Sequence, residues 1–157
     1  MTVVWRIATD TPDYEADDMT GKGAEMTGGR WNPVGTPLVY AADSIALACL
    51  ETLAHLAAGA LPLNRFLVQI TIPDDLIRSA TRETATSLPV GWTSHPPGRV
   101  SIEYGRQWVA SKSAAVLIVP SVIVTESLNF LINPSHSAAS SITAVKVRPW
   151  TFDSRLR

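Results

Sequence analysis

The stretch that most constrains the fold is AAVLIVPSVIV, residues 114–124, which is apolar throughout except at Ser121. A run of this kind predicts a buried strand. Proline lacks the N–H group that a strand uses in its hydrogen-bond ladder, so we expect the strand to end, to bulge or to lie at a sheet edge at Pro120. The hydroxyl of Ser121 is either simply tolerated in this apolar setting or used, which makes Ser121 a first candidate for function.

The rest of the chain predicts further strands and two longer helices. Apolar and β-branched residues predict strands over 3–8, 36–42, 65–73 and 141–153, and a strand followed by a turn over 127–136. Residues 43–59 predict a helix that Asp43 or Ser44 caps and Gly59 ends, and residues 100–114 predict a second helix. Segments 13–26 and 74–99 are expected to be loops, the first with a short helical turn. The pattern indicates an α+β fold in a single domain, 1–157, with a mixed, mostly antiparallel sheet and flanking helices.

Composition excludes several classes of protein. With 157 residues, 46% hydrophobic, 17% charged and a net charge of -1, the chain can build a core, and no basic face predicts direct nucleic-acid binding. The single cysteine, Cys49, is expected to be a buried thiol, and His55, His95 and His136 lie too far apart in sequence to predict a metal site. Neither a signal peptide nor an apolar run long enough to span a bilayer is visible. We therefore expect a cytoplasmic protein with no membrane partner.

Glu51 is the most conspicuous charged residue. It lies in a helical stretch that is apolar nearly all round, where a lone carboxylate is unfavourable unless it is paired or used. No lysine or arginine lies three or four residues away to pair with it. Glu51 therefore either lies on a narrow solvated stripe with Thr52 and His55, or lies at the base of a cleft and accepts a hydrogen bond from a ligand.

Two arginines are candidates for binding an anion. Arg30 follows Gly28 and Gly29, which permit unusual backbone angles and the close approach of a ligand, and its guanidinium suits phosphate oxygens. The alternative is a surface arginine in a turn. Arg6 lies within an apolar strand, with Val4 and Ala8 on its own face. It is either exposed at an edge or points inward, where it would need an anion.

Tyr40 ends a predicted strand, and as a buried aromatic residue its hydroxyl needs a partner. No Ser–His or Cys–His pair has a spacing that predicts an activated nucleophile. Catalysis by an activated nucleophile therefore has no support in the sequence.

Six stretches, in this order, together resemble the RES domain family. They are GGRWNPVGTPLVYAADSIALACLETLAHL (28–56), LPVGW (88–92), YGRQW (104–108), VPSVIV (119–124), LNFLINPSH (128–136) and FDSRL (152–156). The resemblance covers nearly the whole chain. The family takes its name from an arginine, a glutamate and a serine, which correspond here to Arg30, Glu51 and Ser121.

The resemblance implies a toxin of a bacterial type II toxin–antitoxin module with a fold similar to ADP-ribosyltransferase toxins. Its partner would be an Xre-type helix-turn-helix antitoxin that covers the active site and represses the operon, with a possible toxin homodimer inside the complex. RES proteins consume NAD+, some with water or phosphate as the acceptor, and at least one branch ADP-ribosylates a protein. NAD+ would be a substrate, so no cofactor and no metal is expected.

These implications assign a role to each candidate residue. Arg30, with Gly29 giving close access, and Arg6, if it points inward, would bind the NAD+ pyrophosphate. Glu51 would bond the ribose hydroxyls and stabilise the positive charge that develops as the nicotinamide–ribose bond breaks. Tyr40 would stack on the nicotinamide, and Ser121 would orient Glu51 or the ribose. Trp31 is expected to pack the loop against the core.

The residues and the resemblance leave three functional hypotheses for this chain. The leading expectation is NAD+ degradation by phosphorolysis or hydrolysis, and the alternative is mono-ADP-ribosylation of a host metabolic protein. A third, of another class, is a non-enzymatic regulator that binds the antitoxin and tunes operon repression. Segments 9–27 and 74–99 are expected to form the pocket wall that selects the acceptor.

Overall fold

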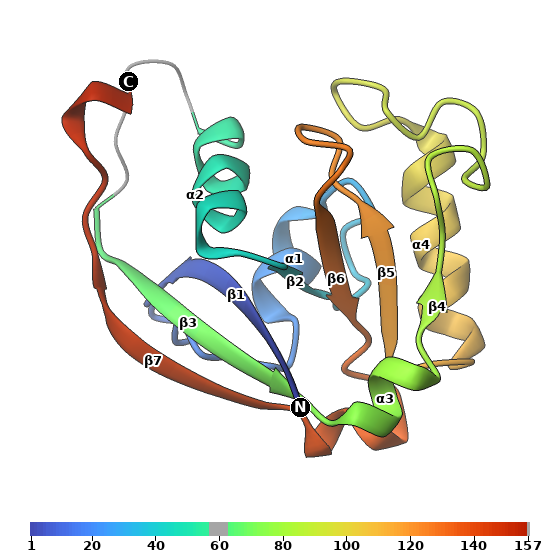
Figure 1. Cartoon of the computed structure of the whole chain (residues 1–157), viewed down its shortest axis with the longest axis horizontal. Helices are drawn as coiled ribbons and strands as arrows, with labels where there is room; N and C mark the ends of the chain where they lie inside the picture. Colours follow the sequence, from blue (N-terminus) through green and yellow to red (C-terminus); the bar gives the residue numbers. More distant parts are fainter. Residues whose placement is uncertain (57–62, 157) are drawn as a thin grey trace.

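A computed structural model of the chain describes residues 1–56 and 63–156. A seven-stranded sheet in the order β4-β5-β6-β2-β1-β3-β7 organises the molecule (Figure 1). Only the pair β4–β5 is parallel, and every other neighbouring pair of strands in this sheet is antiparallel. The prediction of an α+β fold with a mixed, mostly antiparallel sheet is therefore confirmed.

The elements have the following bounds. The strands are β1 (Thr2–Thr9), β2 (Val39–Ala42), β3 (Arg65–Ile72), β4 (Thr81–Arg82), β5 (Val116–Pro120), β6 (Leu128–Ile132) and β7 (Thr143–Trp150). The helices are α1 (Lys22–Thr27), α2 (Ile45–Ala54), α3 (Asp74–Arg78) and α4 (Arg99–Ser111), with 3-10 turns η1 (Ser137–Ser141) and η2 (Ser154–Leu156). Within the described ranges, no helix is both long enough and apolar enough to cross a bilayer.

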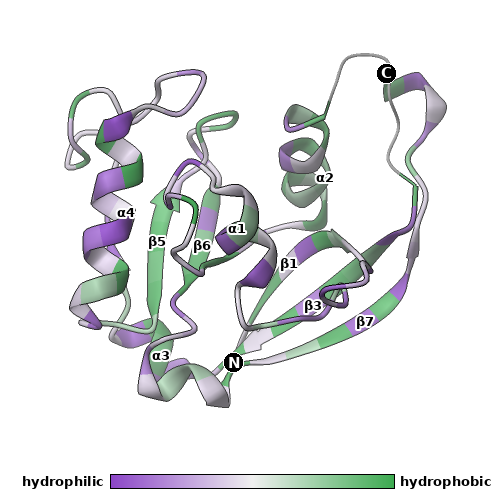
Figure 2. Ribbon diagram, turned by 180° about the vertical axis from the view of Figure 1, so that it is seen from behind, coloured by the Kyte–Doolittle hydropathy of each residue, from purple (hydrophilic) through white to green (hydrophobic). Residues whose placement is uncertain are grey.

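Three apolar clusters hold helices and loops on the sheet. Trp108 and Val109 of α4 pack with Leu117 and Leu131 of the central strands. Leu47 and Leu53 of α2 pack with residues of β1 and β3. A third cluster includes Val4, Val39 and Ile118. Figure 2 shows the resulting pattern, with β5 hydrophobic along its length and α4 more hydrophilic on its outer side.

Strand β5 ends at Pro120, one of the outcomes that the sequence predicted for this position. All five residues from Val116 to Pro120 are buried, and the ladder stops at Pro120. Of the three outcomes expected at Pro120, the strand ends there, and residues 121–124 lie in the segment that connects β5 to β6. Ser121 N donates to Ser127 O at 2.9 Å and closes this connection. Ser121 is consequently the first residue after a fully buried strand.

Helix α2 begins as predicted and ends earlier. Ser44 is its cap, with its side-chain oxygen accepting from Leu47 N at 3.1 Å, while Asp43 accepts from Leu128 N at 2.9 Å. The helix stops at Ala54, where His55 N bonds the Thr52 carbonyl at 3.2 Å and tightens the last turn. The predicted continuation of the helix is therefore wrong for residues 55 and 56. Gly59, the predicted end, lies outside the described residues.

Segment 74–99 is more ordered than a loop. It contains α3 and β4, which are too short to produce a periodic pattern, and β4 pairs in parallel with β5 through Thr81 and Leu117. Leu88 and Trp92 of the same segment are 4% and 5% exposed and belong to the core beneath α4. This segment is thus anchored to the core at two positions.

Helix α4 crosses a backbone segment at Gly105. A Cβ atom at Gly105 would lie 1.6 Å from the carbonyl oxygen of Trp31, far inside van der Waals contact. The helix can approach the chain at Trp31 only because this residue has no side chain.

We expect Gly105→Ala to lower the free energy of unfolding by about 3 kcal/mol, since the helix or the backbone at Trp31 must move to admit the methyl group. Urea denaturation followed by tryptophan fluorescence measures this. The control is Gly98→Ala, where the new Cβ would meet the Ser94 Cβ at an ordinary 3.6 Å. A Gly105→Ala protein as stable as the Gly98→Ala protein would contradict the close crossing.

Candidate active site

A tight turn over residues 29–32 presents Arg30 and Trp31 at its tip. Gly29 N donates to Asn32 O at 2.9 Å and Asn32 N donates to Gly29 O at 3.4 Å. Trp31 is 3% exposed and packs into the core beneath α4, as predicted, while Arg30 stays partly buried. The tryptophan therefore anchors the turn that carries the arginine.

Tyr40 holds this turn from below. Its hydroxyl donates to Asn32 Oδ1 at 2.6 Å and accepts from Trp31 N at 2.9 Å. Burial raises the pKa of Tyr40, so the hydroxyl stays protonated and can donate. A Cβ at Gly29 would lie 2.8 Å from this hydroxyl oxygen. Gly29 is therefore required for the approach of Tyr40.

Asn32 is a structural residue that the sequence reasoning missed. It is fully buried, and its Nδ2 donates to three main-chain carbonyls, those of Ala24, Pro33 and Thr36, at 2.8, 3.2 and 3.0 Å. An asparagine directly before Pro33, in a loop with glycines at 28, 29 and 35, is the available signal, because such side chains commonly bond nearby backbone.

Glu51 and Ser121 form a direct pair. Ser121 Oγ donates to Glu51 Oε1 at 2.7 Å and accepts from Ile123 N and Val124 N at 3.1 and 3.3 Å. Ser121 is fully buried, whereas Glu51 is partly exposed. Among the described residues, Glu51 Oε2 has no hydrogen-bond partner. The buried serine thus orients the carboxylate and leaves one of its oxygens available.

Arg30 is held by the backbone of the loop that follows β4. Its Nη1 donates to the carbonyls of Trp92 and Ser94, both at 2.8 Å. Burial lowers the pKa of Arg30, and the nearby Glu51 and Tyr40 partly offset this. Glu51 is therefore within electrostatic range of Arg30, although no ion pair joins the two within residues 1–56 and 63–156.

Arg6 lies apart from this group. Strand β1 pairs with β2 on one side and β3 on the other, so Arg6 is not at a sheet edge. It alternates with Val4 and Ala8, which belong to a different apolar cluster from Tyr40. Burial lowers the pKa of Arg6, and nearby Asp18 and Tyr14 partly offset this. The structure links Ser121 to Glu51 by a hydrogen bond and places Glu51 and Tyr40 within electrostatic range of Arg30. Among the described residues, no hydrogen bond or ion pair joins the Arg6 side chain to any of these four.

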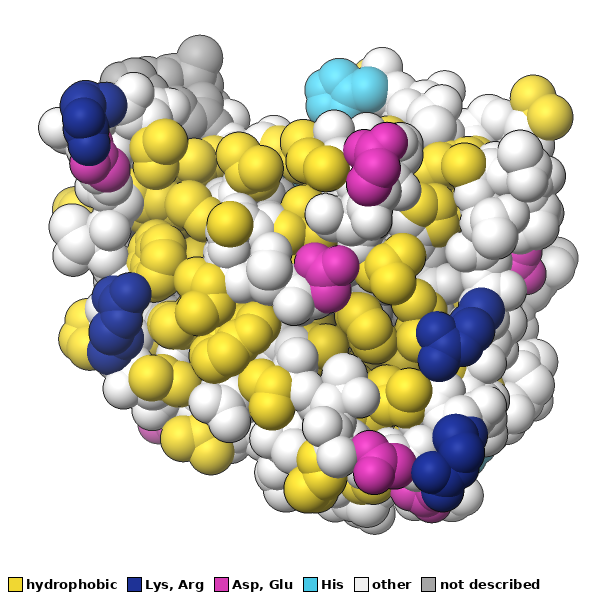
Figure 3. Space-filling view, in the orientation of Figure 1, with side chains coloured by type: hydrophobic (Ala, Val, Ile, Leu, Met, Phe, Trp, Pro, Cys, Tyr) yellow, Lys and Arg dark blue, Asp and Glu magenta, His cyan; other side chains and the backbone are white. Residues whose placement is uncertain are grey.

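The surroundings of α2 are apolar. Figure 3 shows hydrophobic side chains gathered on one face of the molecule, over β1, β3 and β7 and around α2. Exposed apolar side chains of these elements include Val3, Leu50, Val145 and Val147. Burial raises the pKa of the Cys49 thiol on the same helix, which favours its protonated form. The helix that carries Glu51 therefore borders an apolar surface.

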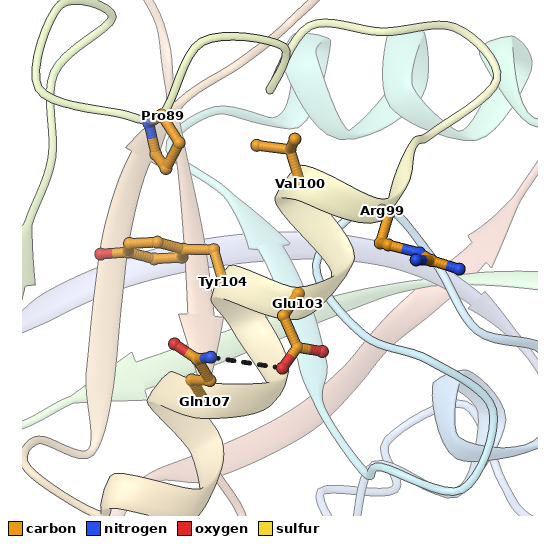
Figure 4. Close-up of a pocket in the computed structure, with 6 residues that line it drawn as sticks. All are labelled: Pro89, Arg99, Val100, Glu103, Tyr104 and Gln107. Atoms are coloured by element: carbon orange, nitrogen blue, oxygen red, sulfur yellow. Dashed lines mark hydrogen bonds between the residues drawn. The ribbon is translucent and has the colours of Figure 1, made fainter.

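A separate hollow of about 320 Å³ lies along α4 (Figure 4). Its lining consists of Pro89, Arg99, Val100, Glu103, Tyr104 and Gln107. None of the predicted site residues lines it. Within the part of the chain that the structure describes, no cluster of His, Cys, Asp or Glu could hold a metal ion.

We expect Tyr40→Phe to lower the free energy of unfolding by about 1–3 kcal/mol, because it leaves the Trp31 N–H and Asn32 Oδ1 without this partner. Urea denaturation measures the change. Tyr14→Phe is the control, since the Tyr14 hydroxyl makes no hydrogen bond to a described residue. Equal stability of the two variants would show that the Tyr40 hydroxyl does not hold the turn.

Comparison with known proteins identifies the fold and the family of the chain. The fold is similar to a chain of the M. tuberculosis MbcT–MbcA toxin–antitoxin complex, with a TM-score of 0.63 and 18% identity, covering 94% of this chain and 85% of that chain. At this identity the likeness shows the fold alone.

Relatives in sequence are closer. The "Prs ADP-ribosylating toxin" of Sphingobium sp. (strain YBL2) is 58% identical over 155 residues, which is 99% of this chain and 96% of that protein. "Toxin Res" of Yersinia enterocolitica is 37% identical over 92% of this chain and 93% of that protein. The RES domain profile matches residues 3–154. The chain therefore belongs to the RES domain family.

Proposed function

We propose that the chain is a toxin that cleaves the nicotinamide–ribose bond of NAD+ and transfers ADP-ribose to a protein acceptor. The observation that carries this proposal is the Glu51 carboxylate, which Ser121 orients at 2.7 Å and which keeps one oxygen available within electrostatic range of Arg30. NAD+ carries a ribose that becomes positively charged as the bond breaks and a negatively charged pyrophosphate. A carboxylate and a guanidinium in one site are complementary to these two charges.

Glu51 supplies the charge that the reaction needs. When the ribose C1′–nitrogen bond breaks, its electron pair leaves with the nicotinamide, which becomes neutral, and the ribose gains oxocarbenium character. A fixed carboxylate stabilises this charge and can accept a hydrogen bond from a ribose hydroxyl through Oε2. The acceptor then forms a bond to C1′ and loses its proton to solvent water. Since the leaving group is neutral, no protein acid is required.

Ser121 acts through Glu51. It is fully buried, its proton is directed to Glu51 Oε1, and its oxygen accepts from two backbone N–H groups. These bonds support the predicted role of Ser121 in orienting Glu51.

Arg30 is the proposed pyrophosphate ligand, because guanidinium groups bind phosphate oxygens in pairs. Tyr40 supports Arg30 by holding the 29–32 turn, and stacking of its ring on the nicotinamide stays a prediction. Arg6 is proposed as a second anion ligand. The length of a dinucleotide permits a contact remote from Glu51.

The choice of acceptor rests on sequence similarity. Degradation of NAD+ by water or phosphate is the leading expectation from the sequence, and the 58% identical relative named an ADP-ribosylating toxin favours protein modification instead. Degradation remains the second candidate, because the same cleavage step serves both. The non-enzymatic alternative does not explain an oriented carboxylate beside an arginine.

An antitoxin is the proposed macromolecular partner. A solved neighbour in fold is a toxin–antitoxin complex, which supports such a partner. The Xre helix-turn-helix type, its cover over the active site and a homodimer within the complex follow from the family resemblance. DNA would then be bound by the antitoxin and not by this chain.

Purified protein incubated with adenylate-labelled NAD+ and cell extract tests the reaction. We expect a labelled protein band and nicotinamide release by proton NMR, and Glu51→Gln should reduce both by about 100-fold, the scale of losing one electrostatic contact to a transition state. Glu103→Gln, which changes a carboxylate on α4 whose side chain is 44% exposed and which lies outside both expected wall segments, is the matched control. Nicotinamide release with no labelled protein would assign degradation, and undiminished activity of Glu51→Gln would remove Glu51 from the mechanism.

The role of Arg6 has its own test. If Arg6 binds the pyrophosphate equally in substrate and transition state, Arg6→Gln should raise KM for NAD+ about tenfold with little change in kcat. Initial rates of nicotinamide release measure both constants, and thermal melting checks the fold. An unchanged KM in a folded variant would restrict anion binding to Arg30.

A further inference from the structure

The Nη1 group of the Arg30 guanidinium already donates hydrogen bonds within the protein. A guanidinium carries five N–H donors, one on Nε and two on each Nη. The Nη1 of Arg30 donates to Trp92 O and to Ser94 O, each at 2.8 Å, so both of its N–H groups are used. In the described part of the chain, Nε and Nη2 of Arg30 have no hydrogen-bond partner.

The edge that remains is a bidentate fork. Nε and Nη2 point the same way and match the two oxygens of a carboxylate or phosphate. Two other arginines of this protein use this same edge. Arg106 donates from Nε and Nη2 to Glu103, and Arg155 does so to Asp153. Arg30 keeps this edge uncommitted.

Trp92 fixes the carbonyls that restrain Arg30. Its indole is 5% exposed and stacks on Trp31 with 6.2 Å between ring centroids and 23° between planes. Trp92 N donates to Pro89 O and Ser94 N donates to Gly91 O, so two successive turns place the two carbonyls. Trp31 is the neighbour of Arg30 on the 29–32 turn. One aromatic stack therefore fixes both the arginine and its acceptors.

We propose that Trp92 is the positioning residue of Arg30: the carbonyls that it places hold the guanidinium by Nη1, so that Nε and Nη2 can donate to one bidentate anion. Trp92 acts through its main chain and its stack on Trp31, without touching the ligand. The identity of that anion, one phosphate group of NAD+, rests on the proposed function. The restraint on Arg30 rests on the contacts alone.

ADP-ribose, which keeps the pyrophosphate and lacks nicotinamide, is the probe. Titration calorimetry should show that Trp92→Leu weakens its binding about tenfold, as expected when a charge-assisted hydrogen bond loses its geometry. Trp108→Leu is the matched control. Trp108 is 6% exposed in the same cluster, and its Nε1 donates to Thr81 Oγ1 away from Arg30. Binding by this control should stay within about twofold of the wild-type protein.

A double-mutant cycle separates positioning from general loosening. In an Arg30→Ala background, Trp92→Leu should cause no further loss of ADP-ribose binding, because it acts through the absent arginine. Ser94→Pro is a second variant, at an exposed position outside the core, that removes the N–H bonded to Gly91 O and displaces the Ser94 carbonyl. It should weaken binding in the same Arg30-dependent way. Equal weakening in the presence and absence of Arg30 would overturn the positioning role.

Nitrogen-15 NMR of the Arg30 side chain tests the restraint without any ligand, with Arg30→Ala used to assign the signals. Two bonds at Nη1 should hinder guanidinium rotation and give separate Nη signals, which Ser94→Pro and Trp92→Leu should merge. Separate signals in both variants would overturn the positioning role. If the signals merge in both variants as expected, the restraint on Arg30 is confirmed. If the wild-type protein then binds no ADP-ribose, the assignment of the anion as an NAD+ phosphate is wrong, and so is the proposed function.

Discussion

The burial of Trp31 is the interaction on which the site depends. Its indole packs between Trp92 and Tyr104, with ring centroids 6.2 and 5.7 Å away. Its carbonyl oxygen occupies the space that Gly105 leaves free, and its N–H donates to Tyr40. Contacts from α4, β2 and the loop before α4 thus converge on one residue. Because Arg30 precedes it in a four-residue turn, fixing Trp31 fixes the direction of the arginine.

The second half of the site depends on where a buried strand stops. Pro120 ends β5, and the next residue, Ser121, lies in the turn beside α2. Glu51 would be unfavourable in an apolar helix without a partner. Ser121 supplies that partner at 2.7 Å. The sheet and the helix are therefore joined at their interface by a polar bond, and this bond also sets the carboxylate that the proposed chemistry uses.

The three main site residues could be picked out from the sequence, because each is a polar or charged residue in an unusual setting. Glu51 stands out in an apolar helix, Ser121 follows a buried strand, and Arg30 follows two glycines. The strands were predictable from runs of apolar and β-branched residues, and the Ser44 cap from the preference for serine and aspartate before the first turn of a helix. The restraint on Arg30 was not predictable, because its acceptors are the main-chain carbonyls of Trp92 and Ser94, and every residue has a carbonyl. Short elements such as β4 also escape prediction, since two residues carry no period.

Under the proposed function, the same loop would connect anion binding to the choice of acceptor. A fold shared at 18% identity does not specify an acceptor, so we place that choice in the walls around Glu51 and Arg30. Residues 83–98 form part of the wall next to Arg30, through the carbonyls at 92 and 94. A change in this loop that admits a new acceptor would also shift those carbonyls and the guanidinium they hold. If the proposed function holds, acceptor specificity and the strength of NAD+ binding should vary together among relatives that differ in this loop.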